Sequence, residues 1–447
     1  MTETTRQPCD LLIEAGWVVP VNPHGVVLVD HAVVVSGDRI VALLPLAEAR
    51  ERFAPAQTVS RPDSVLIPGL VNGHTHNPMT LMRGVADDLS LMPWLHEHVW
   101  PIEGAVMSPE FVADGVELAV AEMLRGGTTC CNESYFFPDA QAATYRRLGF
   151  RARVGLPVIE FPSAWAASTA EYFDKGLEVY DNYRSDPLVS LSFAPHAPYT
   201  VSDESFERIR MLAEQLDLPV HVHVHETAQE IADSLKQYGQ RPIARLDRLG
   251  VVNERLIAVH MTQLIDAEIA LCAERGVSVL HCPQSNLKLA SGFSPVEKLR
   301  RAGVNLGLGT DGCASNNDLD MFDEMRTAAL LAKGVAMDAT ALDAASALRI
   351  ATLGSAKALG LDEHIGSIEV GKQADLTLIA MDALETQPMY NAISHLVYAT
   401  GRHQVSDVWI AGQRKLADRE LVGIDVDALR AKTRQWQQRI AAIGNKP

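Results

Sequence analysis

The feature that most constrains the fold is a repeated alternation of short β-branched runs with helical stretches through the middle of the chain. The runs are residues 65–71, 128–131, 152–159, 189–193, 220–224, 256–259, 277–280 and 304–308. Stretches with helical periodicity lie between them, at residues 111–125, 204–216 and 266–275. This alternation is typical of a parallel sheet with crossover helices. Eight such units over about 250 residues predict a (β/α)8 barrel, whereas a doubly wound open sheet rarely needs eight.

The two ends of the chain have a different texture. Short apolar stretches broken by turn residues fill residues 1–65 and reappear at residues 366–379 and 405–411. Because neither end alone buries enough surface to be stable, we expect them to fold together into a small β-sandwich. The expected division is a composite sandwich domain at residues 1–66 and 362–447 and a barrel domain at residues 67–361.

Charge and composition exclude several classes of partner. The chain has 39 Lys and Arg against 56 Asp and Glu, a net charge of -17, so it repels nucleic acid and anionic lipid. It contains no apolar run of about 18 residues that could span a membrane, and its first ten residues do not resemble a signal peptide. Its six cysteines form no CxxC pair. We expect a cytoplasmic protein with neither a nucleic-acid nor a membrane partner.

Histidines gather where the expected barrel strands end. Eight of the fifteen lie there: His74, His76, His196, His221, His223, His225, His260 and His281. In a barrel the active site is built at the C-terminal ends of the strands. Buried histidines without partners are costly, so their collection at one end indicates a functional site.

The spacing of these histidines favours a metal site. Alternation along a strand places His74 and His76 on the same face, within reach of one ion. The same alternation points all three histidines of the segment 221–225 one way, so the pattern alone does not choose a ligand among them. Asp311 adds a carboxylate at the end of the eighth run. Histidine nitrogens with one carboxylate suit zinc or another borderline divalent ion.

With these motifs the chain resembles the amidohydrolase superfamily, in the branch that holds triazine hydrolases and aminohydrolases of purines and related heterocycles. The motifs that carry the resemblance are Pro68-Gly-Leu-Val-Asn-Gly-His-Thr-His76, His223-Val-His-Glu226, His281-Cys-Pro-Gln-Ser-Asn286, Gly309-Thr-Asp311 and the late segment 366–375. Residues 81–88, 92–94 and 100–103 are further similar to the 5'-methylthioadenosine/S-adenosylhomocysteine deaminases.

The resemblance implies a ligand set for one zinc ion per subunit, namely His74, His76, His223 and Asp311. The family's H-x-x-E motif selects His223, because Glu226 follows it by three residues. His221 and His225 are then expected to line the barrel or to support the ligands. Some relatives with two metals use a lysine after the fourth strand, but Ala194-Pro-His196 has none, which favours one metal.

The resemblance also implies catalytic and substrate-binding roles. Glu226 is expected to protonate the ring nitrogen of the substrate, and Asp311 to accept a proton from the attacking water. His260 is expected to orient that water and to stabilise the developing charge. Glu103 and His196 are expected to hold the ribose hydroxyls, while Glu226 and Asp311 also contact the substrate. Similar proteins are usually homodimers, so a homodimer or higher homo-oligomer is expected.

The function expected from the resemblance is zinc-dependent hydrolytic deamination of 5'-methylthioadenosine, S-adenosylhomocysteine or both. Alternatives within enzymes are deamination of guanine, 8-oxoguanine or a pterin, and hydrolysis of a triazine. A more remote alternative is a non-catalytic barrel scaffold, which would be expected to lose ligand positions that this chain retains. Leu156 stands where similar deaminases place an arginine that contacts substrate. We therefore expect 5'-methylthioadenosine, with its apolar tail, to be the better substrate.

Overall fold

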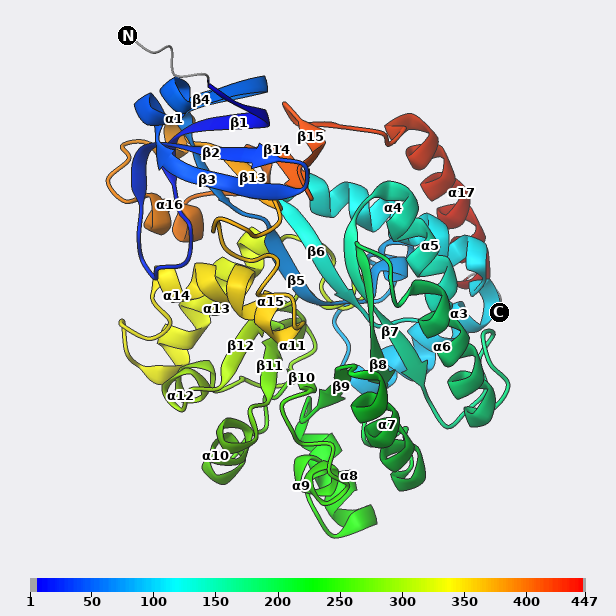
Figure 1. Cartoon of the computed structure of the whole chain (residues 1–447). Helices are drawn as coiled ribbons and strands as arrows, with labels where there is room; N and C mark the ends of the chain where they lie inside the picture. The colour runs from blue at the N-terminus through cyan, green and yellow to red at the C-terminus, as the bar shows by residue number, and fades with distance from the viewer. Residues whose placement is uncertain (1–5, 445–447) are drawn as a thin grey trace.

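Two eight-stranded sheets dominate the computed structural model, which describes residues 6–444 of the chain (Figure 1). One sheet is entirely parallel and comes from the middle of the sequence. The other is mixed and joins the N-terminal and C-terminal segments, as the sequence predicts. The expected domain ranges extend to residues 1–5 and 445–447, which lie outside the described part. The division into two domains at the expected residues stays a prediction.

The parallel sheet confirms the predicted (β/α)8 barrel. Its strands follow one another in space in chain order: β5 (Leu70–Thr75), β6 (Thr128–Glu133), β7 (Arg151–Val158), β8 (Val189–Pro195), β9 (Val220–Val224), β10 (Leu256–His260), β11 (Ser278–His281) and β12 (Asn305–Leu308). Side-chain bonds bring the last strand to the first, since Asn72 donates to the Thr310 hydroxyl at 2.8 Å and accepts from the Thr310 amide at 3.0 Å. The amide of Asp311 also donates to the carbonyl of His74 at 3.0 Å.

Helices pack around the barrel. They are α4 (Pro109–Arg125), α5 (Pro138–Leu148), α6 (Thr169–Tyr183), α7 (Asp203–Leu216), α8 (Ala228–Tyr238), α9 (Pro242–Arg248), α10 (Asp266–Arg275), α11 (Pro283–Lys288), α12 (Val296–Arg301), α13 (Met321–Ala336), α14 (Ala344–Arg349) and α15 (Ser355–Ala358). Several begin at a serine or threonine whose hydroxyl accepts a backbone amide, as Ser108 does from Phe111 at 3.1 Å. No helix within residues 6–444 is long and apolar enough to cross a membrane.

Alternation along each barrel strand separates the interior from the helix-covered face. On β8, Val189, Leu191 and Phe193 belong to the large apolar core, whereas Ser190 and Ser192 between them do not. On β9, Val220, Val222 and Val224 pack into that same core. His221 and His223 therefore point to the barrel interior, and their imidazoles lie at the centre of the barrel.

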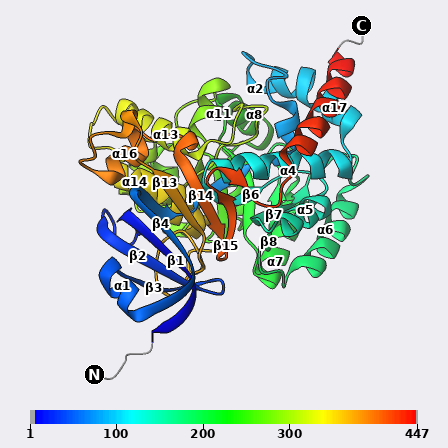
Figure 2. The same ribbon diagram turned by 90° about the horizontal axis from the view of Figure 1, so that it is seen from above.

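The mixed sheet has the spatial order β16-β15-β14-β13-β4-β1-β2-β3. Its strands are β1 (Gln7–Val18), β2 (Leu28–Ser36), β3 (Arg39–Pro45), β4 (Phe53–Pro68), β13 (Leu376–Ala380), β14 (Val405–Ile410), β15 (Gln413–Ala417) and β16 (Glu420–Leu421). Ile13 and Val33 of the N-terminal strands share one apolar cluster with Leu376 and Trp409 of the C-terminal strands. The two chain ends thus enclose a common core, and α1 (Leu46–Arg52) packs beside them (Figure 2).

One expected strand is wrong. The apolar run 65–71 was expected to be the first barrel strand, but it spans two strands of different sheets. The mixed-sheet strand β4 continues to Pro68, and the barrel begins only at Leu70. The two strands are separated by Gly69, where a Cβ atom would lie 2.0 Å from the Thr129 hydroxyl oxygen. A single apolar run gives no indication that the chain changes sheets at such a residue.

The last helix, α17 (Val426–Gly444), packs on the barrel helices. It lies along α4 and the short helix α3 (Trp100–Val106), which Figure 1 labels near it. The indole of Trp436 packs edge-on against Phe111 and donates to Asp114 at 3.0 Å. This helix therefore ties the end of the chain to the side of the barrel.

A buried ion pair joins the two sheets. The Arg151 guanidinium, on β7, donates two bonds of 2.7 and 2.9 Å to the carboxylate of Asp375, which immediately precedes β13. Both side chains are buried, at 5 % and 1 % exposure. The Asp375 carboxylate also accepts the backbone amide of Ala411 at 2.8 Å. Removing the arginine alone would leave a buried carboxylate without its counter-charge.

We expect Arg151→Ala to lower the free energy of unfolding by about 3–5 kcal/mol, because the Asp375 charge becomes buried and unpaired. The matched control is Lys298→Ala, which removes a cation from a largely exposed pair with Asp266. That control should cost about 0–1 kcal/mol. Urea unfolding followed by circular dichroism measures both, and equal losses in the two variants would contradict the prediction.

Candidate active site

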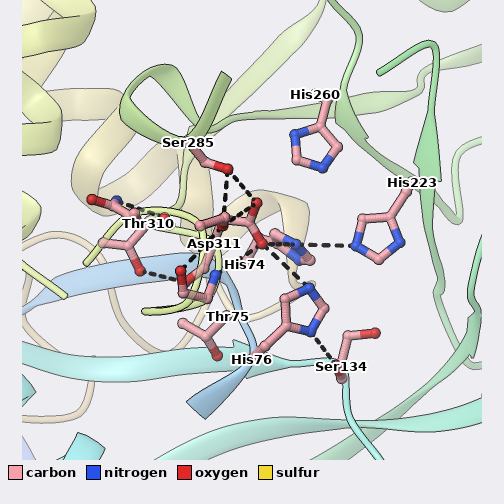
Figure 3. Close-up of polar contacts among 12 residues, drawn as sticks. His74, Thr75, His76, Ser134, His223, His260, Ser285, Thr310 and Asp311 are labelled. Atoms are coloured by element: carbon pink, nitrogen blue, oxygen red, sulfur yellow. Dashed lines mark hydrogen bonds and ion pairs between the residues drawn. The ribbon is translucent and has the colours of Figure 1, made fainter. Parts of the chain in front are cut away.

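Four side chains from three parts of the barrel meet at the C-terminal ends of its strands (Figure 3). His74 lies on β5, His76 directly after it, His223 on β9 and Asp311 directly after β12. The Asp311 Oδ1 atom is 3.2 Å from the Nε2 atoms of both His74 and His76. The Nε2 atoms of His74 and His223 are also 3.2 Å apart. The structure brings all four predicted ligands together.

The hydrogen bonds around these imidazoles leave their Nε2 lone pairs facing one another. The Nδ1 atom of His223 donates to the His196 carbonyl at 2.6 Å, and that of His76 donates to the Ser134 carbonyl. The Nδ1 atom of His74 lies 2.9 Å from Nε2 of His221. Burial lowers the pKa of His74 and His223, so both rings are neutral.

Unprotonated nitrogens 3.2 Å apart repel each other unless a cation lies between them. A tetrahedral zinc ion with ordinary bonds to nitrogen sets its ligand atoms about 3.3 Å apart, close to the spacing found here. The polar partners on the far side of each ring match the support that metal-binding histidines usually have. The residues present therefore fit a divalent metal ion with three histidines and one carboxylate.

Asp311 is held as a carboxylate in a constrained conformation. Its Oδ2 atom accepts from the hydroxyl of Ser285 at 2.7 Å, and Oδ1 accepts from the Gly312 amide at 2.9 Å. Its φ of +63° is left-handed, a strained value for a residue with a side chain.

His260 faces the same centre, but its ring proton lies on Nε2 and not on Nδ1 as in the ligand histidines. The amide nitrogen of Asn286 donates to Nδ1 of His260 at 3.0 Å, so the proton of the neutral ring resides on Nε2. Burial lowers the pKa of His260 to about 3. Its Nε2 atom is 3.8 Å from the carboxyl oxygen of Glu226. This histidine is thus placed as a hydrogen-bond donor to the centre.

Glu226 is placed as a buried acid. Burial, reinforced by the charges of Asp311 and Glu230, raises its pKa well above the usual range. The carboxyl group of Glu230, in the first turn of α8, accepts the backbone amides of His225 and Glu226 at 3.1 and 2.7 Å. The backbone on which Glu226 sits is therefore fixed, and its side chain can carry a proton near neutral pH.

A cavity of about 610 Å³ opens above these groups. Glu226, His260 and Asp311 line one end of it, and Glu103 and His196 also line it. The remaining wall is largely apolar and aromatic, with Trp94, Trp100, Tyr135, Phe136 and Phe161. Its size and lining are typical of a pocket for a small molecule.

The two residues expected to hold a sugar are both buried polar groups. Glu103, on α3, accepts a hydrogen bond from the hydroxyl of Tyr135, and burial raises its pKa to about 7. His196 lies directly after β8, with Nδ1 3.0 Å from the hydroxyl of Thr200. That hydroxyl donates to the Ala197 carbonyl, so it accepts the His196 proton and leaves Nε2 as an acceptor.

Two sequence-based placements are wrong, those of His225 and Leu156. His225 does not share the face of His223, because β9 ends at Val224 and His225 turns away with a φ of +55°. Its Nε2 atom instead accepts the amide of Ile243 at 3.1 Å. His281, whose role the sequence leaves open, is buried but does not line the cavity. Leu156 packs into the outer core, whereas the next residue, Pro157, faces the cavity.

Several contributing residues were not predicted. Tyr135 lies two positions beyond the end of β6, and only the structure shows that it donates a hydrogen bond to Glu103. Ser285 and Asn286 lie in the HCPQSN motif, where their proximity to histidine was the only available indication. Glu230 resembles an ordinary acidic residue in the first turn of a helix, and its role in fixing Glu226 has no sequence signature.

Comparison with known proteins agrees with this geometry. The amidohydrolase family model matches residues 65–415, which covers most of the chain. The chain belongs to the amidohydrolase family. Among curated relatives, a protein of Teredinibacter turnerae named 5-methylthioadenosine/S-adenosylhomocysteine deaminase is 46 % identical, covering 99 % of this chain and all of the relative. One of the same name from Saccharophagus degradans is 45 % identical over 98 % of both chains.

Solved structures resemble this amidohydrolase over almost its whole length. A zinc-bound adenosine deaminase from Xanthomonas campestris is 69 % identical, with a TM-score of 0.97 over 98 % of this chain and all of that one. An atrazine chlorohydrolase from Arthrobacter aurescens aligns with a TM-score of 0.89 over 96 % of this chain and all of that one. That second structure is only 22 % identical, so it supports the fold alone.

We expect His221→Phe to weaken zinc binding by this amidohydrolase about 10- to 100-fold, because the Nδ1 proton of His74 loses its acceptor. His221→Gln keeps an acceptor on a similar side chain and should recover most of the affinity. Competition with a chromogenic chelator measures zinc affinity directly, without reference to activity. Equal affinity of the phenylalanine variant and the wild type would show that His221 does not support His74.

Proposed function

We propose that this amidohydrolase is a zinc-dependent hydrolytic deaminase of adenine nucleosides. It converts 5'-methylthioadenosine, S-adenosylhomocysteine or both to the inosine analogue and ammonia. The proposal rests on one observation above all, that a single cavity holds the metal-capable cluster, a buried acid at Glu226 and a buried carboxyl at Glu103. The names of the curated relatives and of the zinc-bound structure support the same chemistry.

The proposed metal is one zinc ion held by His74, His76, His223 and Asp311. When bound there, zinc lowers the pKa of a water molecule to near 7 and so supplies the nucleophile for attack on the amino-bearing carbon. The Nε2–H group of His260, whose Nδ1 atom is occupied by Asn286, would donate a hydrogen bond to a water molecule held there and orient it. The carboxylate of Asp311 would accept the proton that such a water releases.

Glu226 donates the proton that the ring nitrogen needs. Addition of water to an adenine ring places electrons on the neighbouring ring nitrogen, which must be protonated as the bond forms. The raised pKa of Glu226 keeps its carboxyl group protonated for this step. The proton accepted by Asp311 then goes to the amino group, which departs as ammonia, and the proton of the added hydroxyl group passes to Glu226 as the carbonyl forms, which restores the acid. The products are the hypoxanthine nucleoside and ammonia, with one water consumed.

Glu103 and His196 are proposed to hold the ribose. Tyr135 occupies one oxygen of the Glu103 carboxyl group, and the other oxygen can accept a sugar hydroxyl. The free Nε2 atom of His196 offers a second acceptor. Two buried acceptors in one cavity suit adjacent hydroxyl groups, which guanine, 8-oxoguanine, pterins and triazines all lack. These features favour a nucleoside over the alternative heterocycles.

The first test is deamination by the zinc-loaded enzyme, followed by the ultraviolet shift from adenine to hypoxanthine. Methylthioadenosine, S-adenosylhomocysteine and adenosine should be turned over, while free adenine and guanine should not. Glu226→Gln should lower kcat by at least about 100-fold while zinc content stays at one per chain. Turnover of a free base alone would keep the metal chemistry and overturn the proposed substrate. Loss of zinc in the Glu226 variant would contradict its role as an acid.

The lining of the cavity also predicts which tail is preferred. None of the described residues that line it is a lysine or an arginine, and its wall includes Trp100, Phe161 and Pro162. Because Leu156 does not face the cavity, the preference for methylthioadenosine rests on these wall residues instead. The carboxylate of a homocysteine tail finds no cation here, whereas a methylthio group can be buried against apolar side chains.

We expect kcat/KM for methylthioadenosine to exceed that for S-adenosylhomocysteine by about tenfold or more, since leaving one charged group without a partner costs about 1–3 kcal/mol. Phe161→Arg places a cation at this wall and should narrow the ratio by raising the value for S-adenosylhomocysteine. Phe161→Leu is the matched apolar control and should leave the ratio nearly unchanged. Equal kcat/KM values for the two nucleosides in the wild type would contradict the prediction.

The expected homo-oligomer and cytoplasmic location stay predictions.

A further inference from the structure

A second cavity, of about 690 Å³, lies on the side of the barrel between α4 and α17. Its floor is apolar and includes Leu118, Leu421 and Leu429. Its polar lining is dominated by one residue type, six arginines: Arg83, Arg125, Arg402, Arg419, Arg430 and Arg434. They come from segments far apart in sequence. In a chain with a net charge of -17, such a concentration of arginine at one hollow is unexpected.

Part of this charge is neutralised within the protein. Glu122, which also lines the cavity, pairs with Arg83 and with Arg402, the latter at 2.9 Å. Arg402 further approaches Asp320 at 3.5 Å and Asp318 at 3.9 Å. Arg83 and Arg402 therefore form an internal network with these acids, and they do not account for the excess of positive charge.

The other four arginines carry the excess of positive charge. In the part of the chain that the structure describes, no ion pair joins Arg125, Arg419 or Arg434 to a carboxylate. The fourth, Arg430, pairs with Asp427 at 3.4 Å, and both of these side chains are largely exposed. Such a pair is weak and easily replaced by a stronger anionic partner.

Arg419 is fixed in place before any ligand arrives. It lies in the turn between β15 and β16, and its guanidinium donates to the carbonyls of Arg402 and Val405 at 3.1 and 2.7 Å. Burial and the charge of nearby Arg125 lower the pKa of Arg419, which reflects a cation lacking a counter-charge. A guanidinium already held by two carbonyls loses little freedom when it binds an anion.

We propose that this cavity binds a compact multivalent phosphate anion. Arginine presents several N–H donors in a planar fork that matches phosphate oxygens, and cations around a hollow can contact one ligand from several sides. A flat acidic protein surface would reach only the exposed rim, at Arg125, Arg430 and Arg434. The cavity is distinct from the candidate active site, since it lies beside the outer face of α4 and shares no lining residue with it.

The test uses the zinc-loaded full-length enzyme and isothermal titration calorimetry with inorganic pyrophosphate at low, constant ionic strength. Orthophosphate serves as the less charged comparison. The test variant is Arg125→Ala/Arg434→Ala, which removes two exposed cations from the rim. The matched control is Arg184→Ala/Arg275→Ala, which removes the same number of exposed cations elsewhere. Pyrophosphate also complexes zinc, so zinc content is measured before and after titration, and the titration is repeated on metal-free enzyme.

We expect one pyrophosphate per chain, bound at least about tenfold more tightly than orthophosphate and independently of zinc, because several charge-assisted contacts act together. The rim variant should weaken this binding by at least tenfold, and the control variant should weaken it by less than twofold. Binding that vanishes with the zinc, or that both variants reduce equally, would overturn the proposal. So would an absence of binding. A rim variant that changes only the oligomeric state in sedimentation would instead identify this face as a contact between copies of the chain.

Discussion

The closing of the barrel between its last and first strands is the constraint on which the proposed metal centre depends. His74 lies on the first strand and Asp311 just beyond the last, more than 230 positions later in the sequence. They meet because the Asp311 amide donates to the His74 carbonyl and because Asn72 and Thr310 bond each other across the seam. The repulsion among converging lone pairs opposes this arrangement, so the rigid seam and a bound cation must stabilise it together.

Much of this arrangement follows from the sequence because barrel strands obey simple rules. Short β-branched runs separated by amphipathic helices determine the fold, and the strands of such a fold end at one functional face. The errors arose where a single residue changes the outcome. Two of these errors, at Gly69 and His225, depend on the residue at which a strand ends. The third, at Pro157, depends on which alternate residues of a strand face the cavity. A shift of one residue reverses the face to which every side chain points.

Other features depend on contacts between distant segments and could not be derived from local pattern. His223 and His260 are both histidines at strand ends, yet their proton positions differ. The carbonyl of His196 accepts from Nδ1 of His223, whereas the amide of Asn286 donates to Nδ1 of His260. One ring therefore offers a lone pair to the centre and the other offers a proton. The nature of these partners, and not the histidines themselves, separates a ligand from a donor.

The metal centre alone does not decide what the enzyme acts on. The same barrel occurs in a triazine-degrading enzyme at 22 % identity, so substrate choice must lie in the cavity wall. Among residues 6–444, Tyr135 is the only side-chain donor to the buried Glu103, and a ligand without hydroxyl groups would leave the second oxygen of Glu103 unsatisfied. Sites built to bond a hydroxyl discriminate strongly against analogues that lack one. The opposite demand holds at Trp100 and Phe161, where an apolar wall without cations penalises a charged tail. A nucleoside with an uncharged 5' substituent satisfies both demands at once.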